Sequence, residues 1–81
     1  MREKKDIEKI EIKKVNRDIW RFTFLKSGWV VIELLGSDKK GKDDWKMHLN
    51  AIDLGSALQY IWAFNNGAVG ALKYEELESI D

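Results

Sequence analysis

The sequence lacks cysteine, has a single histidine and has a formal charge of zero. Without cysteine, neither a disulfide framework nor a thiolate metal site is available to this chain. The one histidine, His48, excludes a site with several histidine ligands, and we expect no metal and no cofactor. Because 14 basic residues balance 14 acidic ones, bulk electrostatics gives no argument for binding duplex DNA. Any nucleic-acid role therefore requires a locally basic surface.

Long apolar runs are also lacking. No such run follows the basic residues near the N-terminus, so we expect no secretory signal. The weakly charged stretch 54–72 is interrupted by glycines and by polar residues such as Gln59, which argues against a membrane-spanning helix. We therefore expect a cytoplasmic protein that does not bind membranes.

The 81 residues predict one small domain, with a core only just large enough to fold alone. Such a domain gains from pairing with a second copy. We expect residues 1–6 to be frayed and residues 73–81 to form an acidic C-terminal tail, in which the segment 74–80 forms one short helical turn.

The best-specified element is a helix that begins after Asp53 and ends before Gly67. The Asp53 carboxylate suits an N-cap, because it accepts hydrogen bonds from free amides of the first turn, and Gly67 suits a left-handed stop. At about 100° per residue, one side of this helix is apolar, and its members are Leu54, Ala57, Leu58, Ile61, Trp62 and Phe64. This apolar side must pack against another element.

The opposite side of the helix carries no charge in a chain that is 35% charged. We interpret it as a self-association surface, since small residues let a second backbone approach closely. The dimer interface predicted in this way consists of Ser56, Gln59, Tyr60 and Ala63. The alternative is a polar, uncharged side that faces water.

Four segments ahead of the helix alternate between apolar and polar residues, as half-buried strands do. They are 7–15, 19–25, 29–35 and 45–51, and a glycine-punctuated, charged hairpin loop at 36–44 joins the last two. Short connections favour antiparallel neighbours. We therefore predict an α+β fold, a four-stranded antiparallel β-meander with one α-helix packed on one face, and a dimer.

The alternation also predicts two sheet faces. One faces the helix and consists of Trp20, Phe22, Phe24, Val30, Ile32, Leu34, Trp45, Met47 and Leu49. The other is open and consists of Arg21, Thr23, Trp29, Val31, Lys46, His48 and Asn50.

Catalytic patterns are weak in this chain. The loop 36–43 approaches the phosphate-binding pattern of glycine, four residues and Gly-Lys, but Asp43 stands where a hydroxyl is required and a strand follows instead of a helix. No serine has the glycine setting of a nucleophile, and His48 lacks an evident partner. We expect no enzymatic activity.

The open face suggests a binding surface. A tryptophan among cations stacks a base while the cations hold phosphates, which is how single-strand binders work. The predicted nucleic-acid-binding residues are Arg21, Trp29, Lys39, Lys40, Lys42, Lys46 and His48. Alternatively, Trp29 fills a subsidiary apolar cluster with Leu25, Val31 and Leu35.

Two binding functions therefore stay open. The first is a non-catalytic module that binds single-stranded nucleic acid. The second is a protein–protein interaction module, such as a small adaptor or an inhibitor encoded by a mobile genetic element, since clustered aromatics also suit protein interfaces. The order of four strands and one helix is similar to that of PC4-like transcriptional coactivator domains. This resemblance in topology implies single-stranded DNA binding by a helix-mediated dimer.

Overall fold

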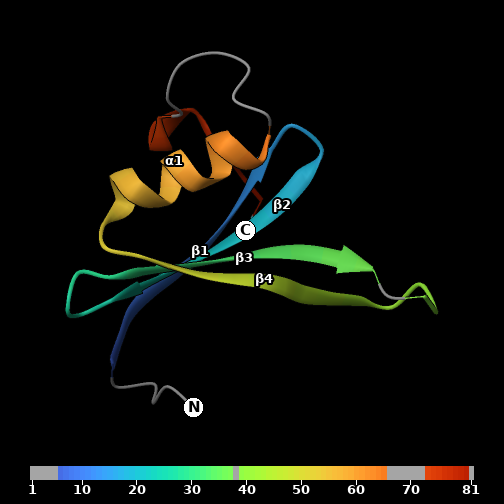
Figure 1. Ribbon diagram of the computed structural model, residues 1–81, viewed down its shortest axis with the longest axis horizontal. Coiled ribbons are helices and arrows are strands. Elements are labelled where there is room, and N and C mark those ends of the chain that lie inside the picture. The colour runs from blue at the N-terminus through green and yellow to red at the C-terminus, as the bar shows by residue number, and fades with distance from the viewer. Residues whose placement is uncertain (1–5, 38, 66–72, 81) are drawn as a thin grey trace.

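The computed structural model describes residues 6–37, 39–65 and 73–80. Its sheet is antiparallel with the strand order β4-β3-β2-β1-β5, and one helix follows the fourth strand (Figure 1). The elements are β1 (Ile7–Val15), β2 (Asp18–Leu25), β3 (Val30–Ser37), β4 (Asp43–Ala51), α1 (Leu54–Phe64), the 3-10 helix η2 (Tyr74–Glu76) and β5 (Glu78–Ser79). The predicted α+β class and the antiparallel meander of the first four strands are confirmed.

Tight turns join the first three strands. Val15 pairs with Asp18 across a two-residue connection in which Asn16 has a φ of 57°, a left-handed conformation that asparagine tolerates. Between β2 and β3, Gly28 has a φ of 103°, which favours glycine. β3 begins at Val30, so Trp29, which was predicted as the first residue of this strand, lies in the connection just before it.

The C-terminal segment differs from the prediction of one helical turn in an acidic tail. It forms η2 and then β5, which pairs with β1 at Lys13 and Lys14 and adds a fifth strand to the sheet. Leu77, between these two elements, is buried in the core. Alternation over so short a segment gave no strand signal, and the contacts that dock it are long-range. Of the predicted frayed N-terminus, residues 1–5 lie outside the described residues, and the Asp6 carbonyl accepts a hydrogen bond from the Lys26 amide.

The helix begins as predicted, because Asp53 is its N-cap and its Oδ1 accepts a 2.8 Å hydrogen bond from the Ser56 amide. Ala57, Leu58 and Ile61 are buried against the sheet. The helix ends at Phe64, with Asn65 as its C-cap. The predicted stop at Gly67 falls outside the described residues.

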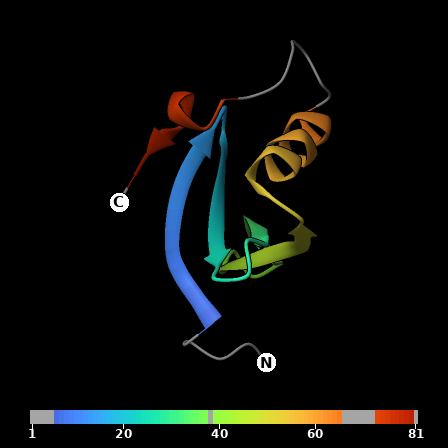
Figure 2. The ribbon, with the colours of Figure 1, turned by 90° about the vertical axis from the view of Figure 1, so that its left-hand side faces the viewer.

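Two elements cover the same face of the sheet. The helix α1 lies above β3 and β4, where Ile61 is buried in the core and the Phe64 ring packs edge-on against Trp20. The Tyr74 ring of η2 packs edge-on against Phe22 and Phe24, with centroid distances of 5.7 and 6.0 Å. In both ribbon views α1 and η2 lie in the upper part of the molecule (Figures 1 and 2). The predicted inward positions of β2 and β3 are confirmed, since Trp20, Phe22, Val30 and Ile32 are buried.

A β-bulge changes the predicted facing of β4. Ile32 pairs with Leu49 and Leu34 pairs with Lys46, so two residues of β4, Met47 and His48, stand opposite Glu33 alone. An extra residue shifts the alternation by one position. Leu49 and Ala51 therefore face inward and His48 faces outward, as predicted.

Before the bulge the predicted facing is reversed. Trp45 pairs with Leu35 and lies on the open face, whereas Lys46 pairs with Leu34 on the helix side. Met47, at the bulge itself, has a φ of 55° and is 39% exposed instead of facing the core. The prediction of Trp45 and Met47 inward and Lys46 outward was wrong, because strict alternation holds only in a strand without a bulge.

Candidate functional site

The open face is the sheet face that neither α1 nor η2 covers. Strand register places side chains from all four long strands on it: Ile7, Ile10, Ile12, Lys14, Ile19, Arg21, Thr23, Leu25, Val31, Glu33, Leu35, Ser37, Asp43, Trp45, His48 and Asn50. Each lies beside its partner on the neighbouring strand, since paired residues in an antiparallel sheet point to the same side. The face is thus apolar over much of its area, with charged residues at its centre.

A carboxylate held by two basic side chains occupies that centre. Glu33 is only 7% exposed. Its Oε1 accepts a 2.7 Å hydrogen bond from Arg21 Nε, and its Oε2 lies 2.6 Å from His48 Nδ1. The bulge at Met47 brings His48 beside Glu33, because Met47 and His48 of β4 both stand opposite Glu33 of β3. The partner that the sequence did not reveal for His48 is therefore Glu33.

Trp45 joins this cluster through Arg21. The Arg21 guanidinium carbon lies 4.4 Å from the centroid of the Trp45 ring, a cation–π contact. Arg21 is thus engaged twice, by Glu33 along its edge and by Trp45 along its plane. Arg21 lies on the open face, as predicted, but one of its hydrogen-bond donors, Nε, is already bonded to Glu33. In this arrangement Arg21 holds Trp45 in place on the face.

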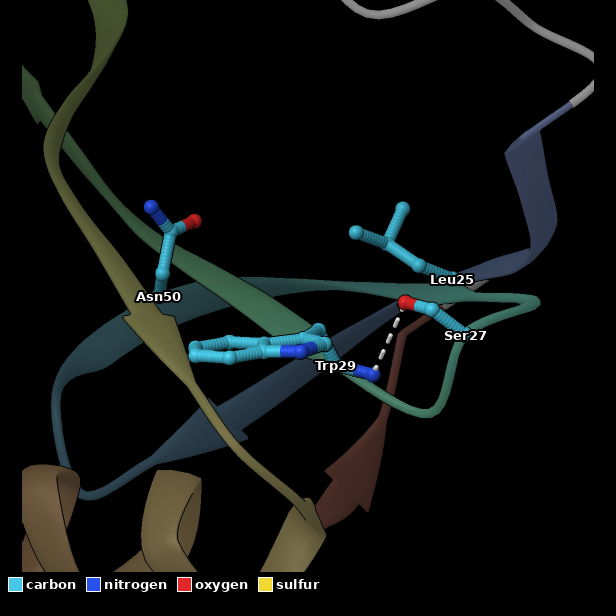
Figure 3. Close-up of a pocket in the computed structure, with 4 residues that line it drawn as sticks. All are labelled: Leu25, Ser27, Trp29 and Asn50. Atoms are coloured by element: carbon cyan, nitrogen blue, oxygen red, sulfur yellow. Dashed lines mark hydrogen bonds between the residues drawn. The ribbon is translucent and has the colours of Figure 1, made fainter.

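A partly open cavity of about 250 Å³ lies around Trp29, at the end of the face near the β2–β3 turn, and is lined by Leu25, Ser27, Trp29 and Asn50. The indole is 44% exposed. Figure 3 shows the ring nearly edge-on, with the side chains of Asn50 and Leu25 rising on the same side of it. The Trp29 amide and Ser27 Oγ are 3.5 Å apart. The ring thus forms a floor with polar and apolar groups around its rim.

Of the predicted lysines, Lys46 lies on the opposite sheet face, where its side chain lies against Gly36 and its Nζ donates a 3.2 Å hydrogen bond to the Ser37 carbonyl. Lys39, Lys40 and Lys42 lie in the β3–β4 hairpin loop, at the other end of β3 from Trp29. The structure therefore places Arg21, Trp29 and His48 on the open face and Lys46 on the opposite face. The role of the loop lysines stays a prediction.

The predicted dimer interface lies on the outer side of α1. Gln59, Tyr60 and Ala63 are exposed, whereas Ser56 is half-buried and its amide is bonded to Asp53. Tyr60 and Phe64, one turn apart, are each 44% exposed. This side thus offers aromatic surface between small and uncharged residues.

A second polar cluster anchors the C-terminal segment. The Tyr74 hydroxyl donates a hydrogen bond to Glu11, and Lys13 Nζ lies 4.7 Å from the Tyr74 ring centroid. This hydrogen bond holds the pKa of Glu11 below its usual value of 4.5, and Lys9 and Lys13 add to the effect while burial opposes it. Burial raises the pKa of the Tyr74 phenol, and the Glu11 carboxylate raises it further.

Comparisons with other proteins add no identity. No family model matches this chain, and neither a curated protein nor a solved structure matches it. Among the described residues, no three histidine or acidic side chains are grouped to hold a metal ion. The helices within that part of the chain are too short and too polar to cross a membrane.

Two site residues were missed by sequence reasoning, namely Glu33 as the centre of the cluster and Trp45 as part of the open face. The sequence contains only a weak indication of this arrangement. Trp45 and His48 are three positions apart, and both reach one face only if a bulge intervenes.

Proposed function

We propose that this protein is a non-catalytic binding module whose open face binds single-stranded nucleic acid. One observation carries the proposal: two tryptophans, Trp29 and Trp45, lie on one uncovered sheet face, with Arg21 and His48 between them. Aromatic side chains on an open antiparallel sheet stack unpaired bases, and every base has a face suited to this. At roughly 3.3 Å per residue along β3, the two rings lie about 20 Å apart, which favours a strand of several nucleotides over a single nucleotide.

The roles on this face divide between stacking and charge. Arg21 is bound to Glu33 and stacked on Trp45, so its role is to hold the Trp45 ring in position for stacking with a base. The phosphate contacts fall to His48, whose side chain is 64% exposed, and to Lys26 in the turn beside the Trp29 cavity. This division predicts binding in which stacking contributes more than charge.

The test is titration of a fluorescently labelled single-stranded oligonucleotide with the protein, followed by anisotropy. Trp29→Ala should weaken binding by about 1–3 kcal/mol, because one stacking platform is lost. Ile10→Ala is a matched control, since Ile10 is similarly exposed at 50% on the same face but offers no aromatic ring, and this variant should bind as the wild type does. Equal affinities for the wild type and Trp29→Ala would contradict the stacking role.

The salt dependence gives a second prediction from the same titration. With Lys26 as one charged phosphate contact, log K should fall with log salt concentration with a slope of about −0.7, at roughly −0.7 per neutralised phosphate on a single strand. A much steeper slope would show that the hairpin lysines contribute, and Lys26→Gln should remove most of a slope near −0.7.

A specific observation favours the second candidate, a protein partner. Ile10 is 50% exposed on the open face, half-buried Ile12, Val31 and Leu35 lie near it, and the central charges are already paired with each other. A near-neutral apolar surface of this kind suits a protein interface. Ile10→Glu should then abolish capture of a stoichiometric protein from a nuclease-treated lysate. Under the nucleic-acid function, the same variant should retain oligonucleotide binding.

We also propose that the protein dimerises through the outer side of α1. Support comes from the exposed Tyr60 and Phe64 rings, which a second copy would remove from water, and from the small Ala63 beside them, which permits close approach. The two open faces would then remain free for ligand in the dimer.

A further inference from the structure

The cavity at Trp29 differs from the rest of the open face in its chemistry. Among the described residues, those that line it contribute an indole ring, an aliphatic side chain, a hydroxyl and a carboxamide, and none of these is charged. Ser27 and Asn50 therefore provide hydrogen-bonding groups at the rim of an aromatic floor (Figure 3). A charged group placed here would lose water without gaining a counter-charge, so the complementary ligand group is neutral.

We propose that this cavity accepts one unpaired base of the bound strand and that Asn50 hydrogen-bonds the edge of that base. The inference rests on the proposed nucleic-acid function and names the feature of the strand that is recognised. A carboxamide presents a donor and an acceptor side by side, which matches the adjacent donor and acceptor on the exposed edge of an unpaired base. The base would stack on Trp29 while its edge meets Asn50.

Size and position agree with this occupant. The volume of about 250 Å³ lies below the roughly 300–1,000 Å³ of sites that enclose a whole small molecule, so the cavity suits one ring system whose sugar and phosphate stay outside. The two residues assigned to phosphate contacts lie close to the lining residues in the chain. Lys26 precedes Ser27 in the turn, and His48 is on β4 two residues before Asn50. An aromatic side chain of a protein would use the floor but leave the two polar groups unpaired.

The experiment measures the affinities of the full chain for homopolymers of deoxyadenosine, deoxycytidine and thymidine of about ten nucleotides. The wild type should bind the three polymers with similar affinities, because each unpaired base offers Asn50 a donor and an acceptor. Asn50→Leu keeps the approximate size of the side chain and should weaken binding of each polymer by about 5- to 150-fold, the range for one bidentate base contact. Asn50→Asp should weaken binding as well, because a carboxylate cannot donate to the base.

The outcomes separate the base-binding inference from the underlying function. Since Asn50 is exposed, both variants should unfold cooperatively like the wild type in urea, which checks that the fold is kept. Wild-type affinity in Asn50→Leu, with loss of binding in Trp29→Ala, would overturn the role of Asn50 and leave stacking in place. Absence of binding to every polymer would overturn both the inference and the proposed function.

Discussion

At the scale of single residues, the backbone at Met47 determines which side chains reach the open face. Its φ of 55° is unfavourable for a residue with a Cβ, costing roughly 1–2 kcal/mol relative to the right-handed regions. The conformation persists because the surrounding pairs, Ile32 with Leu49 and Leu34 with Lys46, hold both flanks of the bulge. The result is that Trp45 and His48 share one face around Arg21 and Glu33.

This strain can be measured at the residue itself. Met47→Gly should be more stable than Met47→Ala by about 0.5–1 kcal/mol, because both lose the side chain and only alanine keeps the strained Cβ. Urea unfolding gives the comparison. At Lys46, whose φ is not in the left-handed region, the same two substitutions should rank in the opposite order, since glycine there only adds freedom to the unfolded chain. Alanine more stable than glycine at both positions would exclude strain at Met47.

At the scale of elements, the C-terminal segment is held to the sheet by one aromatic and polar contact. Tyr74 covers Phe22 and Phe24 and bonds Glu11, and Leu77 completes the core. β5 itself pairs with only two residues of β1. The side chains of 74–77 therefore dock this segment, and the short strand follows from the docking.

The Tyr74–Glu11 contact predicts a pH dependence. The pKa of Glu11 is lowered in the folded state, so the contact stabilises the protein above the unfolded value of 4.5, and this contribution is lost as pH falls through the lower folded value. Tyr74→Phe should cost about 1–2 kcal/mol at neutral pH, as expected for a hydrogen bond to a charged group. The difference from the wild type should shrink as the pH is lowered to about 3.

Urea unfolding of both proteins at several pH values measures this difference. Tyr60→Phe serves as the control, because its exposed ring lies on α1, away from Glu11, and it should track the wild type throughout. A difference between the wild type and Tyr74→Phe that stays constant from neutral to acid pH would show that Glu11 is not the acceptor that matters. The raised pKa of Tyr74 acts in the opposite range: that contribution is present below pH 10 and is lost as the pH rises further.

At the scale of the whole molecule, the two uncovered surfaces separate the two proposed interactions. In our proposals, the open face binds the ligand and the outer side of α1 contacts the second copy. Ala63→Glu should convert a dimer into a monomer, because it would bury two carboxylates, one from each copy, without partners. Light scattering coupled to gel filtration reports the mass. Ala63→Ser should remain dimeric, and a wild type that already has the mass of one chain would refute the interface.

Much of the fold could be predicted from local pattern. The alternation in 7–15 and 19–25 predicted β1 and β2 to within one residue, and Asp53 marked the start of the helix. The inward faces of β2 and β3 were also predictable, because alternation in a strand without a bulge leaves only one apolar side. Of the candidate site, Arg21 on β2 was placed on the correct face for this reason, whereas Trp29 lies just before β3 and His48 lies at the bulge of β4.

The sequence by itself determined the class of the fold, the meander, the helix start and the absence of thiol chemistry, because these depend on residue types and on spacing within one segment. Only the tertiary structure decided the bulge that exchanges Trp45 for Lys46 on the open face, the partners of Glu33 and the docking of β5 on β1. Those features depend on contacts between segments distant in the chain. A shift of one residue in pairing reverses the facing of every residue before it, and it leaves little trace in the local pattern.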